Sequence, residues 1–135
     1  KKAEAYFLKA VNDLKYVNTA GAYENAGLCA LSVPNEDKAK VYFAKALNQD
    51  PSRKVSFYEL LKIEIKAGHD SEAYALVQKH PELVLNDRVL LSLAKEASDK
   101  VGQHAIAAEY EQSINKLNSN TDNSGVNNEY NNHTG

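Results

Sequence analysis

The 135-residue chain lacks methionine and tryptophan and contains one cysteine, three prolines and six glycines. A single cysteine excludes an internal disulfide, a zinc finger and a redox pair of cysteines. Cys29 lies in an apolar stretch, where we expect it to be a small buried hydrophobe; the alternative is a disulfide to a partner outside this chain. Because the sequence starts at Lys1 inside an expected helix, we expect a piece of a longer protein whose targeting signal lies elsewhere.

The chain also lacks a strong excess of charge of one sign and a long apolar run. Sixteen Lys and Arg against eighteen Asp and Glu give a net charge of −2, which does not favour a nucleic-acid partner. No apolar run approaches the roughly 20 residues that cross a bilayer. The chain lacks the common phosphate-binding, dinucleotide-binding, metalloprotease and serine-hydrolase motifs, and its histidines lack metal-like spacing. We therefore expect no enzyme, no catalytic residue, no metal site and no cofactor.

What the sequence does have is an internal repeat, with a period of about 34 residues that is typical of solenoids built from helix–turn–helix units. Ala5, Ala39, Ala73 and Ala107 follow one another at this period, and Gly68 and Gly102 share it, as do Tyr23, Phe57 and Leu91. We expect an all-α array of antiparallel helix pairs over residues 1–117, with about three full pairs after an orphan helix at residues 3–14. Residues 118–135 are rich in asparagine and predict a flexible tail.

The unit at residues 20–53 has the clearest pattern. Gly27 and Ala39 are expected to let two helices approach closely, while Tyr23 and Phe43 fill the space between layers. Asn35 or Asp37 is the expected cap of the second helix, and Ser52 that of the next one. The residues expected to hold the repeat together are Tyr23, Gly27, Ala39, Phe43, Ala46, Pro51, Phe57, Gly68, Ala73, Gly102 and Ala107.

Two further units follow. The first pairs a helix over residues 53–67 with one over residues 71–79, which His80-Pro81 shortens; the second pairs residues 86–98 with residues 103–117. His69 and His104 are expected to be polar residues of the turns, and Glu64 is expected to lie on a solvated helix face.

The first helix of each pair is expected to line a concave groove that binds a partner protein. Its groove positions are Gly21, Glu24, Leu28, Leu31, Val55, Tyr58, Lys62, Ile65, Val89, Ser92 and Glu96. Tyr58 and Ile65 are large apolar groups that stacking does not require, and Tyr is a frequent anchor residue at interfaces. The alternative is that these groups are covered by the shifted register after Pro81 or by the tail.

The repeat pattern resembles a tetratricopeptide repeat. Within it, the stretches AYFLKAVND, NAGLCAL, YFAKAL followed by DP, FYELLK, LLSLAKEA and AAEYEQSI occur between residues 5 and 114. In order and spacing they resemble the C-terminal part of the type IV pilus biogenesis lipoproteins called PilF or PilW. The resemblance extends over nearly all of residues 1–117.

This resemblance implies a pilotin, a lipoprotein at the periplasmic face of the Gram-negative outer membrane. Such a protein helps the pilus secretin reach the membrane or assemble, so the implied partner is a secretin subunit. The lipid anchor would lie outside this chain, and we expect a monomer. The alternative is a cytoplasmic repeat adaptor that docks a partner peptide, but carboxylate clamps of that kind need several groove cations, and we find mainly Lys62 and Lys66.

Overall fold

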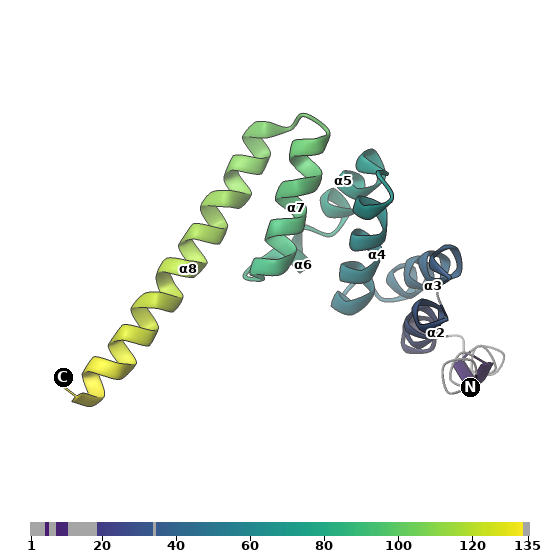
Figure 1. The fold of residues 1–135 in the computed structure, drawn as a ribbon, viewed down its shortest axis with the longest axis horizontal. Coiled ribbons are helices and arrows are strands. Elements are labelled where there is room, and N and C mark those ends of the chain that lie inside the picture. The colour runs from purple at the N-terminus through teal and green to yellow at the C-terminus, as the bar shows by residue number, and fades with distance from the viewer. Residues whose placement is uncertain (1–4, 6–7, 11–18, 34, 134–135) are drawn as a thin grey trace. The chain divides into compact units, whose positions relative to one another are not determined.

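The computed structural model describes residues 5, 8–10, 19–33 and 35–133, with side chains described as far as residue 120. The regular elements among these residues are all helices, which confirms the all-α prediction (Figure 1). They are α2 (Ala20–Ser32), α3 (Glu36–Gln49), α4 (Lys54–Lys66), α5 (Asp70–Lys79), α6 (Pro81–Val84), α7 (Arg88–Lys100) and α8 (His104–His133). Ala5 and residues 8–10 are helical, while the rest of the expected orphan helix lies outside the described residues.

The period of the sequence is reproduced in the helix boundaries. The starts of α2, α4 and α7 (Ala20, Lys54 and Arg88) are separated by equal intervals, as are their ends and the starts of α3, α5 and α8. Helix α5 is shorter than α3 and stops before His80, as the His80-Pro81 pair predicts, and Pro81 then opens the short helix α6. The helix boundaries of the described residues therefore recur with one period.

The chain divides into two compact units, Lys1–Leu76 and Val77–Gly135, with the division inside α5. In the first unit, α2 packs against α3, and α4 packs against both. In the second unit, α7 packs against α6 and against α8, which lies alongside it in Figure 1. The largest fully buried side chains include Phe43, Phe57 and Leu61 in the first unit and Leu90 in the second.

Small residues bring α2 and α3 together as expected. A Cβ atom placed on Gly27 would lie 2.6 Å from a ring carbon of Phe43, so only glycine leaves room for that ring. Most of the expected repeat positions are buried, namely Tyr23, Gly27, Ala39, Phe43, Ala46, Phe57, Ala73 and Ala107. Ala5, the first of the four aligned alanines, is exposed, and so is Pro51, which lies in a turn.

The turns confirm some local expectations and correct others. Asn35 caps α3 because its Oδ1 accepts a hydrogen bond from the backbone N–H of Lys38 (3.2 Å). Gly68 and Gly102 have φ angles of 79° and 83°, the left-handed conformation that glycine adopts without cost. The expected Ser52 cap is wrong: the Ser52 hydroxyl donates to Asp50 (2.6 Å), and the N-cap residue of α4 is Arg53, which makes no side-chain capping bond.

Helix α8 does not end at Leu117, so the helix boundary expected there is wrong. The helix continues to His133, well into the Asn-rich segment. That segment contains no proline, and each residue added to an existing helix contributes one backbone hydrogen bond without a new nucleation cost. Asn118 also ties the extension to α7, because its Oδ1 accepts a hydrogen bond from Arg88 Nη1 (2.9 Å).

Candidate protein-interaction surfaces

In the first unit, three of the predicted groove residues form a patch on α4. Val55, Tyr58 and Lys62 are spaced by three and four residues and share one helix face. Val55 is 47% exposed, Tyr58 is half-buried and Lys62 is exposed. We call these three residues the α4 patch.

The cation and the aromatic ring of the α4 patch interact. Lys62 Nζ lies 4.5 Å from the centroid of the Tyr58 ring and 3.4 Å from its hydroxyl oxygen, and Glu59 is 3.6 Å from the same ammonium. Partial burial opposes the charge, but the hydrogen bond to Tyr58 and the charge of Glu59 outweigh it and raise the pKa of Lys62. The patch thus presents a fixed positive charge beside an aromatic ring and an apolar side chain.

The expected accessibility of Ile65 and Glu64 is wrong. Ile65 is buried in the last turn of α4, so it cannot line an open groove. Glu64 is also buried rather than solvated, and its Oε1 lies 3.1 Å from Lys40 Nζ and 2.9 Å from His69 Nδ1. Lys40 is on α3, so this carboxylate connects α4 to a neighbouring helix.

Glu24 is on α2, but its side chain forms hydrogen bonds with the start of α4. Its Oε2 accepts hydrogen bonds from the backbone N–H of Ser56 (3.0 Å) and from the Ser56 hydroxyl (2.8 Å), while its Oε1 lies 3.4 Å from Arg53. The first N–H groups of a helix have no partner within the helix, so Glu24 caps α4 from another element. The sequence pattern placed Glu24 in a groove and Ser52 at the start of α4, so it gave no signal for this capping role. Leu28 and Leu31 of the same helix are half-buried.

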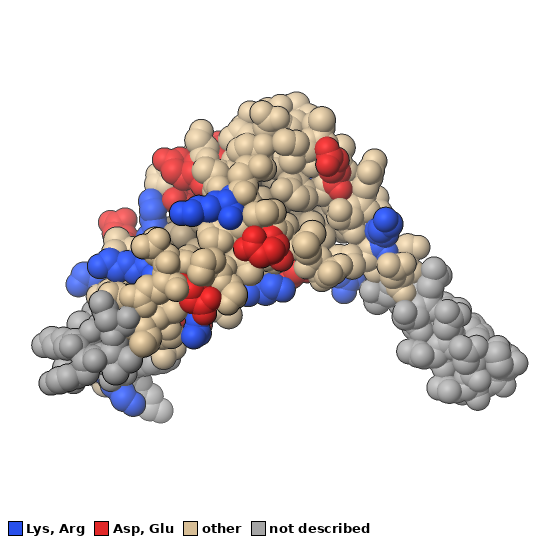
Figure 2. Space-filling view, turned by 180° about the vertical axis from the view of Figure 1, so that it is seen from behind, with Lys and Arg blue, Asp and Glu red and all other residues tan. Residues whose placement is uncertain are grey.

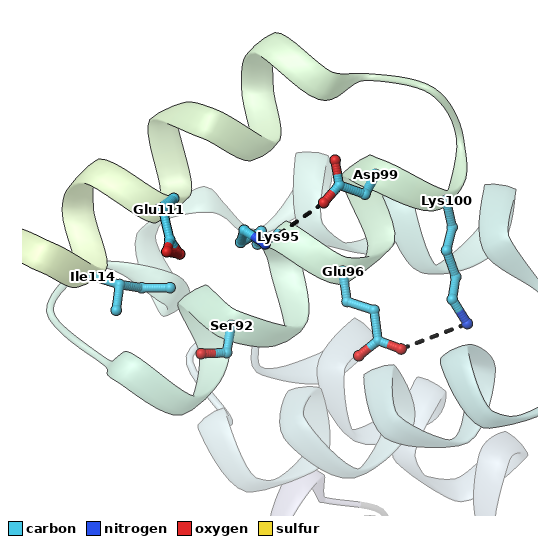
Figure 3. Close-up of a pocket in the computed structure, with 7 residues that line it drawn as sticks. All are labelled: Ser92, Lys95, Glu96, Asp99, Lys100, Glu111 and Ile114. Carbon is cyan, nitrogen blue, oxygen red and sulfur yellow. Dashed lines mark ion pairs between the residues drawn. The ribbon is translucent and has the colours of Figure 1, made fainter.

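In the second unit, Val89 and Ser92 lie exposed on α7 as expected, Val89 with 57% of its surface. Ser92 belongs to a cleft of about 510 Å³ between α7 and α8 (Figure 3). We call it the α7–α8 cleft; its lining residues are Ser92, Lys95, Glu96, Asp99, Lys100, Glu111 and Ile114.

Ion pairs organise the α7 side of this cleft. Lys95 Nζ lies 3.7 Å from Asp99, and Lys100 Nζ lies 3.5 Å from Glu96. A hydrogen bond from His104 (3.0 Å), helped by the charge of Lys95, lowers the pKa of Asp99 despite an opposing effect of burial. Figure 3 shows Glu111 and Ile114 on the α8 side. Ile114 is the hydrophobic residue among the polar and charged residues that line the cleft.

The described residues offer little chemistry beyond these surfaces. No group of three or more His, Cys, Asp and Glu among them could hold a metal ion. None of the described helices is long and apolar enough to cross a membrane. On the face shown in Figure 2, basic and acidic side chains are interspersed among neutral residues. Cys29 is fully buried in α2, which confirms its expected place in the core.

Comparison with models of protein families and with curated proteins finds no match to this chain. The described residues define an all-helical fold in which helices begin at regular intervals along the sequence.

Proposed function

We propose that this chain is a non-catalytic protein-interaction scaffold of the tetratricopeptide-repeat type. The observation that carries the proposal is the common spacing of the helix starts, which is the same for the first and for the second helices of the pairs. The buried alanines Ala39, Ala73 and Ala107 and the left-handed glycines Gly68 and Gly102 support the same assignment. Repeats of this kind stack to present extended surfaces to partner proteins.

The α4 patch is the proposed anchor for that partner. An exposed valine, a half-buried tyrosine and a lysine on one helix face combine apolar area with a positive charge. Tyrosine is favoured at binding surfaces because it offers a large contact area at a low cost in side-chain entropy. The patch therefore suits a segment that carries an apolar side chain, because the Lys62 charge is already paired with Glu59.

The specific role we propose is that of a pilotin for the secretin of a type IV pilus. The ordered sequence blocks between residues 5 and 114 support this role. The partner would be a secretin subunit at the periplasmic face of the outer membrane, with the lipid anchor located outside this chain.

A deletion strain tests the role. We expect loss of pili and of secretin multimers when the gene is removed, and recovery of both when it is restored. Restoration with Tyr58→Ala should recover fewer multimers, whereas Val41→Ala, which trims an exposed valine on α3, should recover them fully. Both proteins should retain the helical circular dichroism of the parent.

Two outcomes would contradict the proposal in different ways. Normal secretin multimers in the deletion strain would reject the pilotin role and favour a generic repeat adaptor. Full recovery by a stably folded Tyr58→Ala protein would place the binding surface outside the α4 patch.

A further inference from the structure

The α7–α8 cleft corresponds by position to a face of the first helix pair that another helix covers. Two repeat periods separate Ser92 from Glu24, and the same interval separates Glu111 from Phe43 and Ile114 from Ala46. The residues lining the cleft are thus the third-pair counterparts of α2 and α3 residues in the first unit.

In the first unit, that face is occupied by α4. Helix α4 packs against both α2 and α3, and Glu24 holds its N-terminus through Ser56. Phe43 and Ala46 are fully buried in this unit, with the Phe43 ring against Gly27 of α2. This arrangement shows what the geometry of such a helix pair accommodates, namely a third helix lying across it.

In the second unit, the equivalent positions line an open cleft. Glu111 and Ile114 are only partly buried and border the 510 Å³ space between α7 and α8. Residues 122 onward, where a fourth pair would begin by the same spacing, continue α8 instead of starting a new helix. The described residues therefore leave this position unfilled.

The charges of the cleft indicate what it would accept. Lys95 and Lys100 are already paired with Asp99 and Glu96. Glu111 has no ion pair or hydrogen bond within the described part of the chain. Because this partly buried carboxylate is unpaired among the described residues, a cationic group of a partner would bind most favourably beside it. Ile114 offers an apolar contact next to it.

We propose that the α7–α8 cleft is a docking site for an amphipathic helix of a partner protein. The helix would place an Arg or Lys opposite Glu111 and an apolar residue against Ile114, in the manner of helix-in-groove recognition. The site is separate from the α4 patch and does not depend on the identity of the secretin.

Two designed peptides test this site. Both are 18-residue Ala-rich helices with one leucine and, four residues later, either arginine or glutamate. We expect the arginine peptide to bind the full chain more tightly in fluorescence anisotropy and to shift the amide NMR signals of Ser92, Lys95 and Ile114. Glu111→Gln should weaken its binding about fivefold to tenfold, whereas Glu109→Gln, on an exposed α8 residue outside the cleft, should not.

A charge reversal completes the test. The Glu111→Lys protein should no longer bind the arginine peptide and should bind the glutamate peptide, while its helical circular dichroism stays unchanged. Equal affinity of the parent, Glu111→Gln and Glu111→Lys proteins for the arginine peptide would overturn the proposal. NMR shifts confined to other helices would also overturn it. If sedimentation shows that the parent self-associates and that Glu111→Lys alone abolishes this, the occupant is a second copy and the proposal is wrong.

Discussion

At Gly27 a missing side chain determines how closely two helices pack. The Phe43 ring occupies the space that a Cβ atom would need, and that ring is itself fully buried. Gly21, on the same helix, differs because a Cβ there would meet the flexible end of Arg53 at 3.3 Å. Glycine is therefore required at position 27 for steric reasons, whereas at position 21 a side chain can be accommodated.

Gly27→Ala should lower the free energy of unfolding by about 1–3 kcal/mol, because overpacking outweighs the roughly 1 kcal/mol that alanine gains over glycine in a helix. Gly21→Ala should be neutral or slightly stabilising. Urea denaturation followed by circular dichroism measures both. Adding Phe43→Leu to Gly27→Ala should recover part of the loss, and simple additivity of the two substitutions would show that the ring is not the obstacle.

At the scale of the element, the start of α4 depends on a residue outside the helix. Arg53 makes no side-chain capping bond, and Glu24 on α2 accepts the backbone N–H of Ser56 instead. Salt contacts between Arg53 and Asp50 (3.5 Å) and the bonds from Ser52 to Asp50 hold the preceding turn. Those bonds from Ser52 are the main reason why the pKa of Asp50 lies below its ordinary value.

Glu24→Ala should destabilise the chain by about 1–3 kcal/mol, because it leaves a part-buried N–H and hydroxyl of Ser56 without their acceptor. Glu24→Gln should cost less, since an amide oxygen can still accept. Native-state hydrogen exchange should show the loss as faster exchange at the first turn of α4. Equal exchange at this turn in the parent and in Glu24→Ala would contradict the capping role.

For the whole molecule, we expect His80 to contribute to the pH dependence of stability. This side chain is buried at the start of α6, and burial lowers its pKa; Lys79 acts in the same direction, and Glu82 opposes it. The unfolded chain therefore takes up a proton near the ordinary histidine pKa of about 6.5, before the folded chain does. Stability is lost as the pH falls below that value.

We expect the free energy of unfolding to decrease between pH 7.5 and pH 5.5, and His80→Gln to reduce this decrease. Asp50 and Asp99 also have lowered pKa values, so their contribution is present above their ordinary pKa and is lost at more acidic pH. Urea denaturation at a series of pH values separates the two ranges. An identical pH profile for the parent and His80→Gln would rule out His80 as the source of the first decrease.

Much of the fold could be predicted from short-range signals. Gly68, Gly102 and Pro81 act on the backbone directly, so they mark helix ends whatever surrounds them. The alanines that recur at the repeat period predicted three buried positions, Ala39, Ala73 and Ala107, because close helix approach requires small side chains. These local constraints made the order and spacing of the longer helices predictable.

The candidate surfaces depended on neighbours distant in sequence. Glu24, Glu64 and Ile65 all have the helical spacing of exposed or groove residues, yet each is buried or bonded by another helix. The α7–α8 cleft likewise brings Ser92 of α7 together with Glu111 and Ile114 of α8, although these residues are about 20 positions apart in the sequence. Periodicity places a residue on a face of its own helix, but the packing of a second helix against that face determines whether it binds, caps or lies in the core.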